Sequence, residues 1–195
     1  YTRLGHQLTL ATDGAAPVAT WRPDLMAARG LSLPKTWEEV LALAKAGQVA
    51  VSLFPVDVLM HVYMFCAAVG TPAFAREGEF APAESISAAL ECLRELGARC
   101  GPESFERNPI RTAEHMTQTD ASAYCPFAYG YSNYSRPRYA PAVLQAGGLV
   151  TFHGKRLRST LGGAGLAISA KTAHPKIAAD YVRFTAEPGT QCGLY

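Results

Sequence analysis

Residues 49–69 constrain the fold more than any other part of the chain. The run 49–53 is short, apolar and rich in valine, which is typical of a buried strand, and Phe54-Pro55 ends it. A helical segment at residues 57–69 follows at once and is apolar on nearly every side. A helix of this kind is buried between a sheet and another layer. The chain therefore requires a layered fold in which a buried strand leads directly into a buried helix.

The clearest helix start lies at residues 36–46. Thr36-Trp-Glu-Glu39 is a capping box, in which the Thr36 hydroxyl accepts from the Glu39 amide and the Glu39 carboxylate accepts from the Thr36 amide. Gly47 then provides a left-handed stop. Apolar periodicity and start signals predict further helices at residues 23–30, 83–99, 108–117 and 175–186.

Short extended segments separate these helices. The expected strands are residues 6–21, in two pieces broken at Asp13-Gly14, and residues 121–124, 149–152 and 166–169, with a small hairpin at residues 74–81. Strands that alternate with helices in this way indicate an α/β fold with short sheets.

Residues 124–134 form an aromatic segment that reads Tyr-Cys-Pro-Phe-Ala-Tyr-Gly-Tyr-Ser-Asn-Tyr. Five of its eleven side chains are aromatic and none is charged. Pro126 and Gly130 interrupt any regular period, so we expect a loop. Tyrosine offers a flat apolar face with a hydroxyl at its rim, which suits stacking against a small ligand. The same rings could instead fold back and cap the core, and the segment alone does not decide between these two interpretations.

The charge balance excludes several classes of function. With 18 Lys and Arg residues against 16 Asp and Glu residues, the net charge of +2 is too small and too scattered for a nucleic-acid-binding face. The basic run at residues 155–158 is expected to be a solvated turn. No apolar run reaches the roughly 20 residues that span a bilayer, so no membrane insertion is expected.

Catalytic and metal-binding motifs are not found. The five cysteines form no CxxC pair and no histidine lies at metal-ligand spacing from them, so we expect neither a metal site nor a cofactor. Gly162, Gly163 and Gly165 precede a strand rather than a helix, which excludes a dinucleotide-binding loop. A thiol-dependent enzyme using Cys125 or Cys66 remains an alternative. The absence of any catalytic constellation favours a binding protein.

Two segments of the chain form a recognisable pattern. The first is Leu33-Pro-Lys-Thr-Trp-Glu-Glu-Val-Leu-Ala-Leu-Ala-Lys45, which a short helix at residues 22–26 precedes. The second is Gly162-Gly-Ala-Gly-Leu-Ala-Ile-Ser169, which a helix at residues 176–184 follows. In this order and separation, with the aromatic segment between them, they resemble the family 1 extracellular solute-binding proteins of bacterial ABC importers. The resemblance spans nearly all of the chain.

The resemblance implies a two-lobed type II periplasmic-binding-protein fold. The chain is expected to supply the hinge strand and crossover at residues 1–21, the C-terminal, ligand-binding lobe at residues 22–161, and the return crossover with one helix of the partner lobe at residues 162–195. Proteins of this family are longer than this chain. The first part of the other lobe, with its signal peptide, and a C-terminal tail are therefore expected outside the sequence.

The resemblance also implies a function. The expected protein is the non-enzymatic substrate-binding component of an ABC importer, periplasmic or otherwise extracytoplasmic. It would capture a small solute, with a carbohydrate or polyol favoured, in a cleft between lobes and deliver it to a membrane permease. A sensory binding protein on the same fold is the second alternative.

Carried over to this chain, the ligand site would combine ring faces, an acceptor carboxylate and exposed backbone amides. The expected ligand-binding residues are Asp13, Phe54, Asp57, Tyr124, Phe127, Tyr129, Tyr131, Gly163 and Ala164. Among the rings, Tyr129 and Tyr131 beside Gly130 are favoured over Phe127 and Tyr134.

Overall fold

A computed structural model describes residues 2–194 of the chain and divides it into two compact units. The larger unit is residues 16–160, and the smaller unit joins the first segment, up to Ala15, to the last segment, from Leu161. The predicted boundaries, after residues 21 and 161, stay a prediction; the first division of the structure, after Ala15, lies before the predicted one. Which lobe of a two-lobed fold each unit forms remains a prediction.

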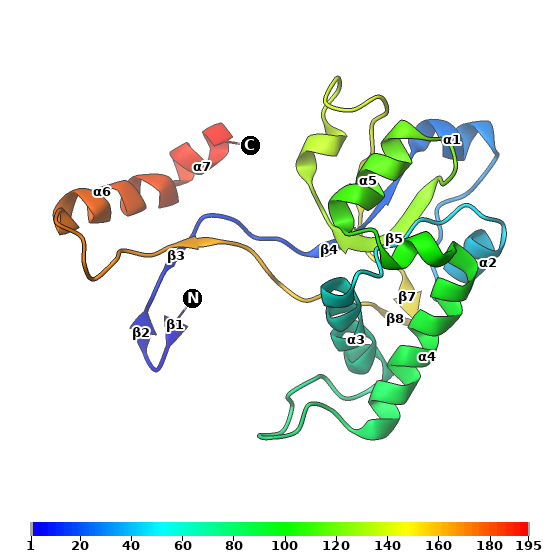
Figure 1. Cartoon of the computed structure of the whole chain (residues 1–195), viewed down its shortest axis with the longest axis horizontal. Coiled ribbons are helices and arrows are strands. Elements are labelled where there is room, and N and C mark those ends of the chain that lie inside the picture. Colours follow the sequence, from blue (N-terminus) through cyan, green and yellow to red (C-terminus); the bar gives the residue numbers. More distant parts are fainter. Residues whose placement is uncertain (1, 195) are drawn as a thin grey trace. The chain divides into compact units, whose positions relative to one another are not determined.

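The larger unit is built on a three-stranded antiparallel sheet in the order β5-β4-β6 (Figure 1). Its strands are β4 (Pro17–Trp21), β5 (Tyr124–Tyr129) and β6 (Gln145–Gly147). Trp21 pairs with Tyr124 on one side and with Gln145 on the other. The indole N–H of Trp21 also donates to the side-chain oxygen of Gln145 at 3.0 Å. The central strand β4 is thus joined to both neighbours at its last residue.

Strand β5 occupies residues that the sequence predicted to be a loop, and a bulge explains the error. The register between β4 and β5 shifts between Val18 and Thr20, so that Pro126 and Phe127 together oppose one residue of β4. A bulge on an edge strand is one of the few places where a strand accommodates proline, which cannot donate to a ladder. The loop prediction is wrong for residues 124–129, and the strand predicted at 121–124 meets β5 only at its last residue.

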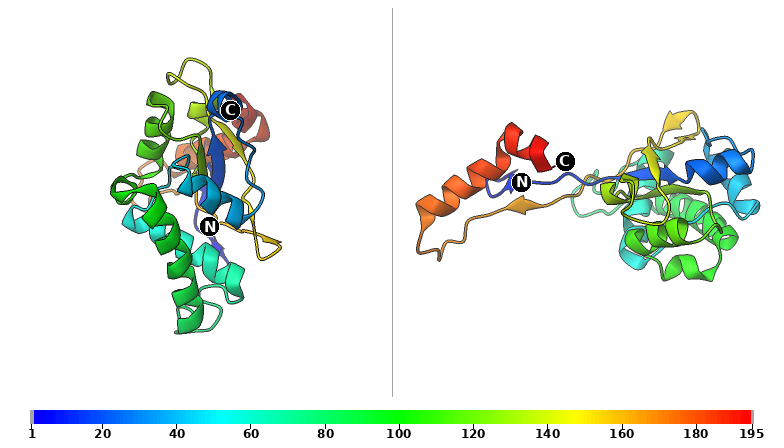
Figure 2. Two further views of the ribbon diagram at one scale, coloured as in Figure 1. Left: turned by 90° about the vertical axis from the view of Figure 1, so that its right-hand side faces the viewer. Right: turned by 90° about the horizontal axis from the view of Figure 1, so that it is seen from above.

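Five helices surround this sheet, all close to their predicted positions. They are α1 (Pro23–Ala28), α2 (Trp37–Lys45), α3 (Pro55–Val69), α4 (Ala83–Cys100) and α5 (Pro109–Gln118). The capping box of α2 is confirmed, because the Glu39 amide donates to the Thr36 hydroxyl at 3.3 Å and the Thr36 amide donates to the Glu39 carboxylate at 3.3 Å. Helices α3 and α4 pack side by side (Figure 1 and Figure 2).

The core of the larger unit is an aromatic cluster between the sheet and α3. The Trp37 ring lies 5.0 Å from Phe65 and 6.2 Å from Phe127, and Phe65 lies 5.5 Å from Phe152, measured between ring centroids. Phe65 and Phe127 are fully buried. Packed rings of this size supply much of the apolar burial that stabilises a small unit.

Two predictions for this region are only partly right. The run 49–53 is buried and extended, but it makes one isolated parallel bridge, Val49 to Tyr124, rather than a regular strand. Helix α3 buries one side against the core, yet its Val56 and Leu59 side chains are 58% and 40% exposed. Helix α3 thus lies between the core and α4, as expected, but one side of its first turns is exposed within this unit.

Short turns complete the larger unit. Residues 151–156 form the hairpin of β7 (Thr151–Phe152) and β8 (Lys155–Arg156), whose turn residues His153 and Gly154 are both at positive φ. The hairpin predicted at residues 74–81 is a tight turn, in which Arg76 bridges Glu79. Short 3-10 helices lie at Pro102–Phe105 and Ser132–Ser135.

The smaller unit contains paired short strands and two helices. Its elements are β1 (Thr2–Arg3), β2 (His6–Gln7), β3 (Leu10–Ala11), β9 (Gly165–Leu166), α6 (Pro175–Ala186) and α7 (Pro188–Leu194). Strand β3 pairs with β9, and Leu10 lies opposite Leu166. Helix α6 has its predicted bounds. Its apolar pattern predicts an inner side that includes Ile177, Tyr181, Val182 and Phe184, but only Val182 is buried and the other three are exposed.

Candidate functional site

The end of β5 gathers several of the predicted ligand-binding residues of the larger unit. Val49 lies parallel to Tyr124, so the extended run that Val49 begins points the same way as β5. Phe54 and Tyr129 end these two segments and therefore lie at the same end of the unit. Strand β4 runs the opposite way and starts there, because Pro17 pairs with Tyr129.

Both chain connections to the smaller unit also leave from this end. Ala16 directly precedes Pro17, and Thr160 is the last residue of the larger unit. The hydroxyl of Tyr129 lies 2.9 Å from the hydroxyl of Thr160, and either can donate. This hydrogen bond holds the rim of the half-buried Tyr129 ring against the outgoing chain.

Two further rings stand open to solvent near this end. Tyr131 is 47% exposed and Phe54 is 43% exposed. We call Phe54, Tyr129, Tyr131 and Thr160 the β5-end site. It offers apolar ring faces together with hydroxyl groups, which is the combination expected for stacking on a polyhydroxylated ligand.

Tyr124 and Phe127 belong to the core instead. They are 2% and 0% exposed, and Phe127 packs against Trp37 and, at 4.4 Å between centroids, against His61. Burial also raises the pKa of the Tyr124 phenol above its ordinary value. Both side chains point into the packed core, so neither ring offers a face to a ligand.

Asp57 likewise points into the larger unit rather than out of it. It is 4% exposed, and the Ser52 hydroxyl lies 2.7 Å from its carboxylate and 2.9 Å from the Arg107 carbonyl. A hydroxyl has one hydrogen for these two acceptors, so a protonated Asp57 that donates to Ser52 would satisfy all three groups. Burial raises the pKa of Asp57 in the same sense. Asp57 fastens the start of α3 beside Phe54.

The predicted ligand-binding residues of the smaller unit lie together on its crossover. The amides of Thr12 and Asp13 donate to the Ala164 carbonyl at 3.0 and 3.3 Å. Gly163 has a φ of +133°, and a Cβ there would lie 2.2 Å from the Asp13 carbonyl oxygen, so only glycine fits. Asp13, Gly163 and Ala164 are all exposed.

A groove runs along α3 in the larger unit. Its first part has a volume of about 270 Å³ and is lined by Tyr63, Met64, Ala67, Pro72, Ala73, Phe74, Arg158, Ser159 and Thr160. Its second part has a volume of about 750 Å³ and is lined by Ala67, Ala68, Pro72, Lys155, Arg156, Leu157 and Arg158. Thr160 belongs both to the first part and to the β5-end site, so the groove begins beside Tyr129.

The cysteines considered as nucleophiles are buried. Cys125 and Cys66 are both 0% exposed, and burial raises the pKa of Cys125 to about 12 and that of Cys66 above its ordinary value. A nucleophilic thiol needs a lowered pKa and access to substrate. The geometry thus opposes the thiol-dependent alternative.

Within residues 2–194, no group of three or more His, Cys, Asp or Glu side chains could hold a metal ion. No helix in the same range is long and apolar enough to cross a bilayer.

Comparison with known proteins identifies the fold. No protein-family model matches the sequence, and no curated protein matches it by sequence. An ABC transporter solute-binding protein from Agrobacterium radiobacter, solved with ribitol, superposes with a TM-score of 0.81 at 19% identity, covering 98% of this chain and 52% of its own. A solute-binding protein from Thermotoga lettingae with α-D-tagatose gives 0.77 at 17% identity, covering 99% and 53%. The maltose-bound protein MalE3 of T. maritima gives 0.76 at 19% identity, covering 97% and 53%.

This is the fold of an ABC transporter solute-binding protein. The chain spans about half the length of these solved proteins. The resemblance drawn from the sequence is confirmed at the level of the fold. Its two motifs lie at α2 and at the β9 crossover of the solute-binding fold.

The sequence did not point to the residues of the groove. Tyr63 lies within an apolar helix and carries no distinguishing pattern, and Phe74 precedes a turn. Arg158 belongs to the basic run that was predicted to be solvated. It is exposed, as expected, and it also lines the groove. The sequence does not show that Arg158 lacks a carboxylate partner among residues 2–194. Only the positions of the charged side chains in space show this.

Proposed function

We propose that the chain is part of the substrate-binding component of an ABC importer, acting outside the cytoplasm. A carbohydrate or polyol is the favoured solute. The proposal is supported by the fold and by the ligands of three proteins that share it, ribitol, α-D-tagatose and maltose. The two lobes would close on the solute, and a membrane permease would recognise the closed form.

In the larger unit, the proposal depends mainly on Tyr129. Its ring stands at the end of β5 and its hydroxyl is held by Thr160 at 2.9 Å. A fixed ring stacks on the CH face of a sugar at low entropic cost, while its hydroxyl reaches the polar edge. Phe54 and Tyr131 offer further exposed ring surface.

Asp13, Gly163 and Ala164 are the proposed ligand-binding residues of the smaller unit. An exposed carboxylate accepts from solute hydroxyls, and exposed backbone amides donate to them. The glycine at position 163 keeps the backbone accessible, since a side chain there would collide with Asp13.

Thermal unfolding of the 195-residue chain with a solute panel tests this function. The panel contains ribitol, D-tagatose and maltose, together with amino acids, polyamines and organic acids, each at millimolar concentration. We expect at least one sugar or polyol to raise the Tm saturably, because a ligand that binds only the folded state stabilises it. Tyr129→Ala should reduce the shift, because it should weaken binding by roughly tenfold. Thr36→Ala, which removes a helix cap far along the sequence, should lower the Tm but keep the shift. A panel that gives no shift in any class would contradict the proposal.

A further inference from the structure

The first part of the groove contains fixed aromatic surface. The Tyr63 ring lies 6.0 Å from Phe74 and 5.4 Å from Phe80, and Phe74 lies 5.2 Å from Phe80. Phe74 is nevertheless 66% exposed. The rings thus support each other while one face remains available.

The backbone at Phe74 is held in an unusual conformation. Its φ is +58°, in the left-handed region that a bulky residue rarely adopts. Its amide donates to the Phe80 carbonyl at 2.6 Å, which closes the turn that presents the ring. Conformations of this kind persist where the surrounding structure enforces them, and they gather at ligand-binding sites.

The charge in the groove has a single sign. Lys155, Arg156 and Arg158 line its two parts, and no aspartate or glutamate does. Arg158 forms no ion pair with any residue from 2 to 194. An unpaired guanidinium beside ring faces is suited to a planar carboxylate, which it binds through two parallel hydrogen bonds.

Hydroxyl groups link this charge to the β5-end site. Ser159 and Thr160 line the same part of the groove as Arg158. When the Tyr129 hydroxyl donates to Thr160, the Thr160 hydrogen is free for a ligand. The volume of about 270 Å³ lies below the range of drug-sized pockets and suits a single sugar ring.

We infer that this part of the groove is a subsite for an anionic sugar, a monosaccharide that carries a carboxylate. Arg158 binds the carboxylate, Tyr63 and Phe74 support the ring, and Ser159 and Thr160 bind hydroxyls. The inference rests on the proposed function and narrows it, since the ligands of the three similar proteins are neutral.

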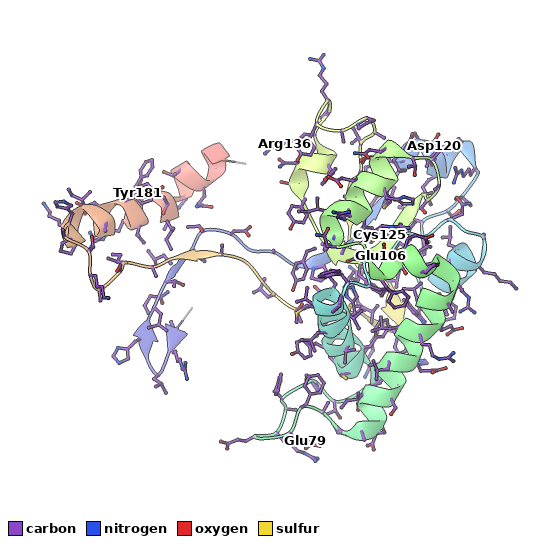
Figure 3. All side chains as sticks on the ribbon, viewed as in Figure 1. Glu79, Glu106, Asp120, Cys125, Arg136 and Tyr181 are labelled. Carbon is purple, nitrogen blue, oxygen red and sulfur yellow. The ribbon has the colours of Figure 1, made fainter. Side chains whose placement is uncertain are left out.

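Calorimetric titration with D-galacturonate and D-galactose tests the subsite, because these sugars differ only in a carboxylate against a hydroxymethyl group. The 195-residue chain should bind D-galacturonate more tightly by roughly tenfold or more, the value of a charge-assisted hydrogen bond. Arg158→Gln should abolish that preference and leave D-galactose unchanged. Arg136→Gln is the matched control, because Arg136 is an exposed arginine outside the groove (Figure 3) and its removal should change neither affinity.

Three outcomes would overturn the inference. The first is equal affinity for the two sugars, and the second is a preference for D-galacturonate that survives in Arg158→Gln. The third is an Arg158→Gln variant that changes only the sedimentation of the chain, which would make the groove a contact surface between proteins. Failure of the proposed function is separate, because it requires that neither sugar binds and that the wider solute panel gives no thermal shift.

Discussion

The aromatic segment divides into two halves that differ in role although they share residue types. Tyr124 and Phe127 are buried in the core, whereas Tyr131 is 47% exposed and the half-buried Tyr129 ends the strand. Composition does not distinguish the halves. The neighbours do, because Tyr124 and Phe127 are enclosed by other elements whereas Tyr129 and Tyr131 lie at and beyond the end of the paired strand. Tyr134, the last ring of the segment, is buried again in a second core cluster.

The point of division is set by the length of β4. Pro17, the first residue of β4, pairs with Tyr129, the last residue of β5. Before this point, β5 pairs with β4, Val49 bridges its first residue, Tyr124, and His61 of α3 packs against Phe127. Beyond it, the backbone has no strand partner, and Gly130 turns the chain away. A stacking ring at the end of a rigid strand is better positioned than one on a free loop.

The largest effect is expected for Phe127→Ala, which empties the centre of the buried half. Removing a fully buried phenylalanine ring should lower the free energy of unfolding by about 3–5 kcal/mol, through lost burial and the cavity that remains. Urea denaturation followed by fluorescence measures this loss. Phe127→Leu is the control and should restore most of the stability, because it refills much of the volume. A loss below about 1 kcal/mol for the alanine variant would show that the ring is not part of the core.

A pH dependence of stability is the second expected effect, and it belongs to the same buried half. Burial lowers the pKa of His61 from 6.5 to about 4. The folded state therefore favours neutral histidine, and its stability is fully present above pH 6.5 and declines as the pH falls toward about 4, by on the order of 3 kcal/mol. Urea denaturation between these pH values measures the slope.

His61→Gln separates this effect from that of Asp57. The raised pKa of Asp57 acts in the opposite direction, since its stabilisation is present at low pH and is lost as the pH rises through its folded pKa. Glutamine cannot titrate but can still donate to the Ser52 carbonyl, which accepts from His61 at 3.0 Å. The variant should lose the decline on acidification. An unchanged slope in His61→Gln would assign the decline to another group.

The contrast between the halves also shows how far the sequence could predict this molecule. Helix α2 was predicted because its signals are local: Thr36, Glu39 and Gly47 act within one segment. Strand β5 was missed because proline reads as a strand breaker until its partner is known, and the bulge at Pro126 requires β4, which lies more than 100 positions earlier in the chain.

The candidate site was predicted only in outline, because local sequence signals identify aromatic side chains but not their neighbours in space. Tyr129 and Tyr131, the two rings favoured beside Gly130, are less buried than Tyr124 and Phe127, and their contact with a ligand stays a prediction. Tyr124, Phe127 and Asp57 were included because sequence shows the type of a side chain but not the layer that covers it. The hydrogen bond from Tyr129 to Thr160 joins residues with no shared sequence pattern.

Substitutions of Tyr129 test the boundary between the two halves. They should affect stability less than Phe127→Ala does, but they should affect binding directly. Tyr129→Ala should weaken binding of a sugar or polyol found in the thermal screen by roughly tenfold, the value of one stacked ring. Tyr129→Phe keeps the ring and removes the hydrogen bond to Thr160, so it should retain most of the affinity and cost about 1 kcal/mol of stability. Calorimetric titration and urea denaturation of both variants separate the two contributions. Equal loss of binding in both would assign recognition to the hydroxyl rather than the ring face.

Tyr131→Ala should have the smallest effect on stability and thereby completes the contrast with Phe127→Ala. Tyr131 is 47% exposed and follows the last paired residue of β5, so its removal leaves no cavity. The free energy of unfolding should change by less than about 0.5 kcal/mol, as for most surface substitutions. Any loss of solute affinity in this variant is then a loss of contact rather than of folding. A destabilisation as large as that of Phe127→Ala would mean that the ring packs against the unit, and the division of the segment at Tyr129 would be wrong.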